Sequence, residues 1–559
     1  MTATVTPRRP APPQPQGHST ELTGTWRLLR LALRRDRIVL PVWIVVLIGL
    51  LGATVGSIIG LYATEADRLA YATIAATNVV ARAFDGPMSG TSLGAITMTE
   101  SFGILAVLAG IMSVQAIVRH TRLEEETGRA ELIGAGVVGR HAPLVAALSV
   151  VTGANLVMGI AVSVTLLAAG LPATGSLLAG AALAGVGLTF AGVAAVAAQV
   201  SETARGANSI GIVAVAAAFM LRAIGDATGR VAASGVEVVS AWPSSLSPIG
   251  WGQQIRAFGD DRVALLLLFV AAAGLLIVAA FGLRTRRDVG AGVLPIRPGP
   301  AVAGPTLLRP VGFALRLHRG ALIGWAAGLA VVAAALGGVA HEVEELIETS
   351  EELAALLAGT GGSGVLVDLY IAFAMVILAL TATAFLIQAV LRVRSEELAG
   401  RVEPVLATAV SRTRYLAVHV VWAIAGLIAI LVAIAVSAAV TAGVVTGDWD
   451  GVIGDWVVAA AVQVPAALVI GGIAVVAVAW LPRPAPAIAW AALILSLVIG
   501  QFGQLFGLPQ TVVNISPFSH VPAVPAEDLR LLPLLVLTAI AAGLYLLGFV
   551  GWRRRDVRC

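Results

Sequence analysis

The sequence contains no lysine, so all 36 of its basic residues are arginine. An ordinary P-loop needs a lysine that reaches the nucleotide phosphates, and such a loop is therefore excluded in this chain. Cysteine occurs once, as Cys559. A single cysteine excludes an intramolecular disulfide, a CxxC redox pair and a cysteine-based metal site. We expect no cofactor in this chain.

Charged residues are also scarce. They make up 12% of the sequence, hydrophobic residues make up 58%, and the mean hydropathy is +0.93. Soluble domains carry roughly 25% charged residues, so most of the surface of this chain is expected to face lipid. We attribute the pI of about 9.8 to arginines at the cytoplasmic ends of helices, and we expect no nucleic-acid partner.

Apolar runs of about 18 or more residues predict transmembrane helices. Six such runs in the first part of the chain and six in the second predict an all-α, polytopic integral membrane protein with about twelve transmembrane helices. The predicted spans are 38–61, 96–118, 143–170, 175–199, 206–226, 263–283, 319–340, 366–391, 415–442, 456–481, 484–508 and 531–552.

Arginines cluster at alternate ends of these spans. They precede the first span, lie between spans two and three, six and seven, and eight and nine, and follow the last span. The other side holds the acidic stretch from Glu342 to Glu352 and the acids Asp448, Asp450 and Asp455. Because arginine-rich loops stay in the cytoplasm, we expect both termini to be cytoplasmic.

The two parts of the chain repeat each other. Residues 122–140 read RLEEETGRAELIGAGVVGR, and residues 394–412, at an offset of 272 positions, read RSEELAGRVEPVLATAVSR. Most of the identical residues are charged, so a shared lipid environment does not explain the match. Three shorter echoes are Ala32-Leu33-Arg34 with Ala314-Leu315-Arg316, Ser247-Pro248 with Ser516-Pro517, and Arg286-Arg287-Asp288 with Arg554-Arg555-Asp556.

The shared pattern R-x-E-E-x-x-G-R-x-E indicates a short helix on the cytoplasmic side of each half. Glu125 and Arg129, like Glu397 and Arg401, are four residues apart, which favours a weak ion pair on a helix. Two copies at equivalent places predict a paired docking surface for a two-fold symmetric partner. The predicted docking residues are Arg122, Glu124, Glu125, Gly128, Arg129 and Glu131, and Arg394, Glu396, Glu397, Gly400, Arg401 and Glu403.

This pattern, repeated in two six-span halves, resembles the fused permeases of ABC exporters of the ABC-2 superfamily, in particular the actinobacterial tetronasin or polyketide-antibiotic type. The resemblance implies coupling helices near 122–140 and 394–412, which dock on a separate homodimeric ATPase, and amphipathic elbow helices at 25–37 and 308–319. It implies ATP and Mg on that partner, a bacterial plasma membrane location, and export of hydrophobic or amphipathic drug-like compounds. The chain itself would be a transport permease and no enzyme.

The domain boundaries follow from the repeat and from one Pro- and Gly-rich stretch. Residues 1–24 are expected to be a disordered cytoplasmic tail, and residues 25–289 the first transmembrane half. A linker of 290–307 would lead to the second half, 308–559.

Two other functions compete with this interpretation. The first is an ion-coupled multidrug carrier of the major-facilitator type, which also has about twelve spans in two parallel halves. Such carriers usually keep ionisable residues at mid-membrane, but Glu100 and Asp368 are predicted near outer ends and His419 near a cytoplasmic end. The second is a membrane enzyme, which would need paired carboxylates or a metal cluster in a sizeable loop. The candidates are Asp260 and Asp261, or Asp448, Asp450 and Asp455, although solvated loop acids explain them better.

Overall fold

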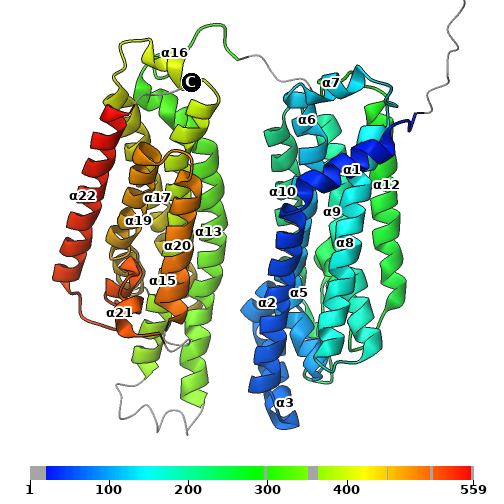
Figure 1. Cartoon of the computed structure of the whole chain (residues 1–559). Helices are drawn as coiled ribbons and strands as arrows, with labels where there is room; N and C mark the ends of the chain where they lie inside the picture. Colours follow the sequence, from blue (N-terminus) through cyan, green and yellow to red (C-terminus); the bar gives the residue numbers. More distant parts are fainter. Residues whose placement is uncertain are drawn as a thin grey trace, which may run out of the picture. The chain divides into compact units, whose positions relative to one another are not determined.

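The computed structural model describes residues 21–294, 299–349, 363–447, 449, 451–503 and 508–555. The chain divides into two compact units, Met1–Pro298 and Gly299–Cys559, here called the first and second halves (Figure 1). The division falls within the predicted linker 290–307. Three predictions lie wholly or mostly outside the described residues or their side chains. They concern the disordered tail, the acidic stretch after Glu342, and the acids Asp448 and Asp450.

The described residues are almost entirely helical, which confirms the all-α class. Their only strands are β1 (Arg230–Val231) and β2 (Val238–Val239), which pair antiparallel in a loop of the first half. Within the described ranges, eleven helices are long and apolar enough to cross a membrane, and a shorter apolar helix covers Ala485–Gln501. That shorter helix lies in the predicted span 484–508, so each of the twelve predicted spans corresponds to an apolar helix.

The first half is a bundle around one small-residue helix, α9. Its helices are α1 (Thr25–Asp36), α2 (Val39–Leu61), α3 (Glu65–Thr77), α4 (Val79–Phe84), α5 (Leu93–His120), α6 (Arg122–Glu126), α7 (Arg129–Gly134), α8 (Ala142–Ala168), α9 (Ala173–Val200), α10 (Ala204–Ala227), η1 (Trp242–Leu246), α11 (Pro248–Gln254), η2 (Val263–Leu265) and α12 (Leu266–Arg284).

Helix α9 packs against α5, α8, α10 and α12. Its buried face is rich in glycine and alanine, which lets neighbouring backbones approach closely in a membrane. At Gly180 a Cβ atom would lie 2.2 Å from the carbonyl oxygen of Gly159 on α8. The packing of α8 on α9 therefore requires glycine at that position.

The second half repeats the bundle, with its first three long helices extended and the fourth divided in two. Its helices are α13 (Pro310–Thr349), α15 (Ser363–Leu398), α16 (Val402–Leu406), α17 (Arg412–Thr446), α18 (Val452–Ala461), α19 (Val464–Trp480), α20 (Ala485–Phe502), α21 (Gln510–Val513), η3 (Pro517–His520) and α22 (Leu531–Arg554). Helix α19 lies against α15, α20 and α22, and α18 lies against α17. Together α18 and α19 take the place that α9 has in the first half.

The two predicted elbow helices differ. Helix α1 ends at Asp36 and a turn separates it from α2, as predicted. In the second half the predicted elbow 308–319 is not a separate helix, because α13 runs without a break from Pro310 into the apolar span. The polar anchors differ as well: buried Asp36 accepts a hydrogen bond of 2.9 Å from Arg119 and lies 2.6 Å from His120 Nε2. In the second half His318 Nε2 lies 3.0 Å from Nδ1 of His419.

Candidate docking site

The repeated pattern lies at one end of each half, between the second and third long helices (Figure 1). We call residues 122–134 the first motif segment and residues 394–406 the second, and the end of each half that carries it the motif end. The first segment consists of α6 and α7, and the second of the end of α15 followed by α16. Gly128 and Gly400 separate the two parts, with φ of 72° and 67°. These left-handed backbones suit glycine and end the preceding helix.

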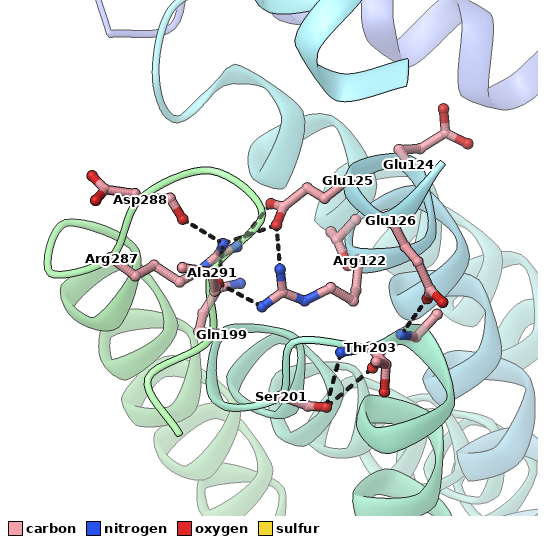
Figure 2. A network of polar contacts seen from close by, with 12 residues as sticks. Arg122, Glu124, Glu125, Glu126, Gln199, Ser201, Thr203, Arg287, Asp288 and Ala291 are labelled. Carbon is pink, nitrogen blue, oxygen red and sulfur yellow. Dashed lines mark hydrogen bonds and ion pairs between the residues drawn. The ribbon is translucent and has the colours of Figure 1, made fainter. Parts of the chain in front are cut away.

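Glu125 is held between two arginines in the first half (Figure 2). Arg122 Nη1 donates to Glu125 Oε2 over 2.6 Å. Arg287, beyond the end of α12, donates to both carboxylate oxygens over 2.8 Å. The three side chains are buried, at 0%, 6% and 4% exposure. A bidentate, charge-assisted contact of this kind fixes geometry as well as adding energy.

Glu397 has the equivalent partners in the second half. Arg394 Nη1 donates to Glu397 Oε2 over 2.9 Å, and Arg555 Nη2 donates to Glu397 Oε1. The Glu397 side chain is fully buried. We call each of these three-residue sets an Arg–Glu–Arg brace.

Each brace also contacts a third element, through a side chain in the first half and through the backbone in the second. Arg287 Nε donates to Gln199 Oε1, at the end of α9, over 2.8 Å, and Arg122 Nη2 donates to the carbonyl of Ala291 over 2.7 Å. In the second half Arg555 Nη1 donates to the carbonyl of Val478 near the end of α19 over 2.6 Å. The brace therefore connects the motif segment, the last long helix and the buried central helix of its half. It also gives a role to the echo of Arg287 in Arg555, which sequence comparison detects without explaining.

The other glutamate of each pattern pairs differently from the prediction. Arg129 lies 3.6 Å from Glu124, and Arg401 Nε donates to Glu396 over 2.6 Å. The predicted pairs four residues apart, Glu125 with Arg129 and Glu397 with Arg401, are wrong. The left-handed glycine turns the chain before each arginine, so the arginine meets the glutamate five positions back.

The predicted docking residues thus separate into two sets. Arg122, Glu124, Glu396 and Glu397 are buried, and Glu125, Gly128 and Arg394 are partly buried, so the acids of this set are occupied by contacts within their half. The surface residues of the set are Arg129, Glu131, Gly400, Arg401 and Glu403.

Large apolar side chains lie beside the exposed polar residues. Leu132 is 80% exposed and Val137 is 78% exposed in the first half, and Leu398 is 71% exposed in the second. Apolar side chains rimmed by charges mark surfaces that bind proteins. The accessible part of each motif segment therefore has the composition of a docking surface.

Glu126 has a contact that the sequence analysis did not anticipate. Its carboxylate accepts a hydrogen bond of 2.8 Å from the backbone N–H of Ala204, the first residue of α10. An acid at this place satisfies a free N–H and matches the positive end of the helix dipole. Leu398 stands at the equivalent position of the second half, so only the first motif segment is tied to the start of the fifth long helix in this way.

Asp36 secures the elbow of the first half by charge. Burial opposes its ionisation, but the hydrogen bond and charge of His120, and then of Arg119, outweigh burial and hold the pKa of Asp36 below its usual value. Among the described residues no group of three or more His, Cys, Asp or Glu side chains could hold a metal ion.

The chain is similar over its whole length to a known protein. The chain is 38% identical to the multidrug efflux system permease protein Rv1217c of Mycobacterium tuberculosis (strain ATCC 25618 / H37Rv), over 561 residues that cover 100% of both chains. Residues 307–553 match the family described as the C-terminal domain of the multidrug efflux system permease Rv1217c.

Proposed function

The chain belongs to the ABC-type permease family of the multidrug efflux system permease Rv1217c, and we propose that it forms both transmembrane halves of an ATP-driven multidrug exporter. Its substrates would be hydrophobic or amphipathic compounds, of the kind that the tetronasin-type permeases are expected to export. ATP and Mg would be bound by a separate homodimeric ATPase. The chain is a transporter subunit and no enzyme.

One observation carries this proposal. The same Arg–Glu–Arg brace occurs under both motif segments, and each segment leaves charged and apolar side chains exposed beyond it. Two equivalent surfaces on one chain suit a partner with two-fold symmetry. The chain has no lysine and therefore no ordinary P-loop, so in an ATP-driven exporter the ATP site would be on another polypeptide.

The braces suggest how force would be transmitted. Closure of the ATPase dimer would displace the motif segments. Because each brace joins its segment to the last long helix and to α9 or α19, these elements would move as one rigid unit. The arginine-rich motif ends would face the cytoplasm, with both termini on that side of the bacterial plasma membrane.

The first test is co-purification of the full chain from its native host. We expect a P-loop ATPase in stoichiometric amount. Combined charge reversal of the exposed acids, Glu131→Arg with Glu403→Arg, should reduce the ATPase recovered by about tenfold or more, since several interface contacts change sign together. Glu65→Arg, on α3 at the opposite end of the first half, is the matched control and should leave recovery unchanged.

Two results would overturn the proposal. One is full ATPase recovery with the double reversal. The other is a chain that purifies alone and transports drugs under a proton gradient without ATP, which would favour a secondary carrier. Glu125 and Glu397 are poor choices for this test, because their substitution removes the brace and disturbs the fold as well as the surface.

A further inference from the structure

A cavity of about 260 Å³ lies at the motif end of the first half. Its walls come from α1, α7, the loop before α8, the start of α8 and the end of α12. Two backbone hydrogen bonds close it over the loop, from Gly139 N–H to the Thr23 carbonyl over 2.9 Å and from His141 N–H to the Glu21 carbonyl over 3.0 Å. The cavity is thus a built pocket between the elbow helix and the motif segment.

The lining of this cavity is amphipathic. Its apolar wall includes Leu31, Ile133 and Val138, while Arg140 and Arg284 stand together on one side. These two arginines are held by reciprocal contacts: Arg140 Nη2 donates to the carbonyls of Arg284 and Thr285 over 3.1 and 2.9 Å, and Arg284 Nε donates to the carbonyl of Arg140 over 2.9 Å. Two like charges are therefore fixed side by side next to an apolar surface.

The acids around the cavity do not balance its arginines. Glu124 is bound by Arg35 and Arg129, and Glu125 by the brace, with Arg284 4.0 Å away. Arg140 forms no ion pair with any carboxylate in the described part of the chain. The lining therefore keeps a positive excess of one charge: the arginines are Arg35, Arg140, Arg284 and Arg287, and the acids are Glu124, Glu125 and Asp288.

The position of the cavity adds a membrane surface. Helix α1 carries Arg27, Arg30 and Arg34 together with large exposed apolar side chains, among them Trp26 at 66% and Leu33 at 51%. A short helix of this kind lies in the interfacial plane of a bilayer, where basic residues attract anionic headgroups. The cavity therefore lies beside the headgroup layer.

The second half has a cavity at the corresponding place, of about 270 Å³, but with different chemistry. By the repeat, Arg284 corresponds to Trp552 and Arg35 to Leu317. Trp552 is fully buried, and its Nε1 donates to the Arg412 carbonyl over 3.0 Å, as Arg284 does to Arg140. One arginine, Arg309, lines the second cavity, so an anion site is expected in the first half alone.

We propose that the cavity of the first half binds an acidic phospholipid. Its phosphate lies between Arg140 and Arg284, and the start of an acyl chain covers Leu31, Ile133 and Val138. The bound lipid joins the elbow helix to the motif segment and supplies the negative charge that the surrounding acids do not. This site requires a membrane surface at the motif end and is independent of the ATPase, so its failure and that of the proposed function are distinguishable.

The test is native mass spectrometry of the delipidated full chain, titrated with phosphatidylglycerol or phosphatidylcholine in detergent. We expect one phosphatidylglycerol to bind at least about tenfold more tightly than phosphatidylcholine, the scale of a charge-assisted hydrogen-bond pair. Arg284→Trp, which copies the second half, should remove this preference, and Arg284→Lys should restore much of it. Arg412→Ala, in the second half, is the matched control and should bind like the unchanged chain.

A second variant guards against misfolding at Arg284. Ile133→Trp fills the apolar part of the cavity and leaves every arginine in place. This variant should also lose the bound lipid. Equal binding of the two lipids, or an unchanged preference in both cavity variants, would overturn the proposal. Displacement of the lipid by inorganic phosphate alone would assign the site to a free anion. Displacement by oleate alone would assign it to a fatty acid. Either result would overturn the phospholipid proposal.

Discussion

The two halves of this protein share the brace that holds the motif segment and differ in several contacts around it. Both hold a buried glutamate between an arginine of the motif segment and an arginine beyond the last long helix. Around that brace, the first half has the Glu126 cap and an arginine-lined cavity, where the second has Leu398 and Trp552. The comparison indicates that duplication preserved the attachment of the motif segment, while the surroundings of the brace became unequal.

The sharpest test of the shared feature is removal of its glutamate. Glu125→Ala and Glu397→Ala each leave two arginines without their carboxylate in a buried site, which costs about 3–5 kcal/mol. We expect both variants to lower the thermal unfolding midpoint of the full chain in detergent by similar amounts. Glu131→Ala and Glu403→Ala, at the exposed positions, should change it little. A large effect in one half alone would contradict the equivalence of the braces.

The outer loop of the first half should respond to pH. Burial, and then the nearby Glu100 carboxylate, raise the pKa of Asp85 to about 6, against the smaller lowering effect of Arg222. A raised folded-state pKa means that stability is full below the unfolded pKa and is lost as pH rises through about 6. Local protection of residues 78–92 should therefore fall by roughly 1–3 kcal/mol between about pH 5 and about pH 7.5.

Hydrogen exchange corrected for intrinsic rates measures this difference, and Asp85→Asn should abolish it. In the repeat, Ala372 replaces Glu100. The part of the shift that comes from Glu100 therefore has no counterpart in the second half. Protection that rises with pH in the unchanged chain would contradict the predicted direction of the effect.

The two left-handed glycines provide a test of intermediate size. Gly128 and Gly400 have φ of 72° and 67°, and a Cβ at either would meet nothing within 4 Å. Substitution by alanine should thus act through the backbone alone and cost about 1–2 kcal/mol in each half. Asparagine, which tolerates this conformation better, should cost less. If the alanine and asparagine variants have equal thermal unfolding midpoints, backbone strain is not the cause of the destabilisation.

The smallest expected effect concerns a contact of the first half only. Glu126→Ala removes the carboxylate that accepts from Ala204 N–H, and the loss of such a cap costs about 1 kcal/mol. Leu398→Ala at the equivalent position should be close to neutral, because that side chain is 71% exposed. Faster hydrogen exchange at the start of α10 in the first variant is the measurement, and equal exchange would contradict the cap.

Sequence patterns were sufficient for the architecture. Continuous apolar runs and arginine placement predict the helices, and the repeated charges predict two halves, because both signals are local or repeated at a fixed offset. The weak place is the eleventh predicted span, where prolines and glycines frame the short helix α20. The predicted second elbow also fails as a separate helix, since residues 310–320 continue into the span without a stop signal.

The pairing of charges could not be predicted in the same way. The pattern places Glu125 four residues before Arg129, and a helix would pair them, but Gly128 interrupts the helix. The actual partner, Arg287, lies 162 residues away along the chain, and it comes next to Glu125 only in the folded bundle. The same holds for the cavity, because Arg140 and Arg284 become neighbours only through hydrogen bonds between the loop before α8 and the end of α12, and they share no sequence pattern.

The separation of the brace partners along the chain also determines when each brace can form during synthesis. Glu125 and Glu397 are made 162 and 158 residues before Arg287 and Arg555. At about 5–20 residues per second, each glutamate waits roughly 10–30 s for its partner to leave the ribosome. The first motif segment therefore becomes fixed only when its own closing helix has been inserted, and this happens before most of the second half exists. The brace of each half is thus completed by an arginine made near the end of that half, and the two halves are completed one after the other.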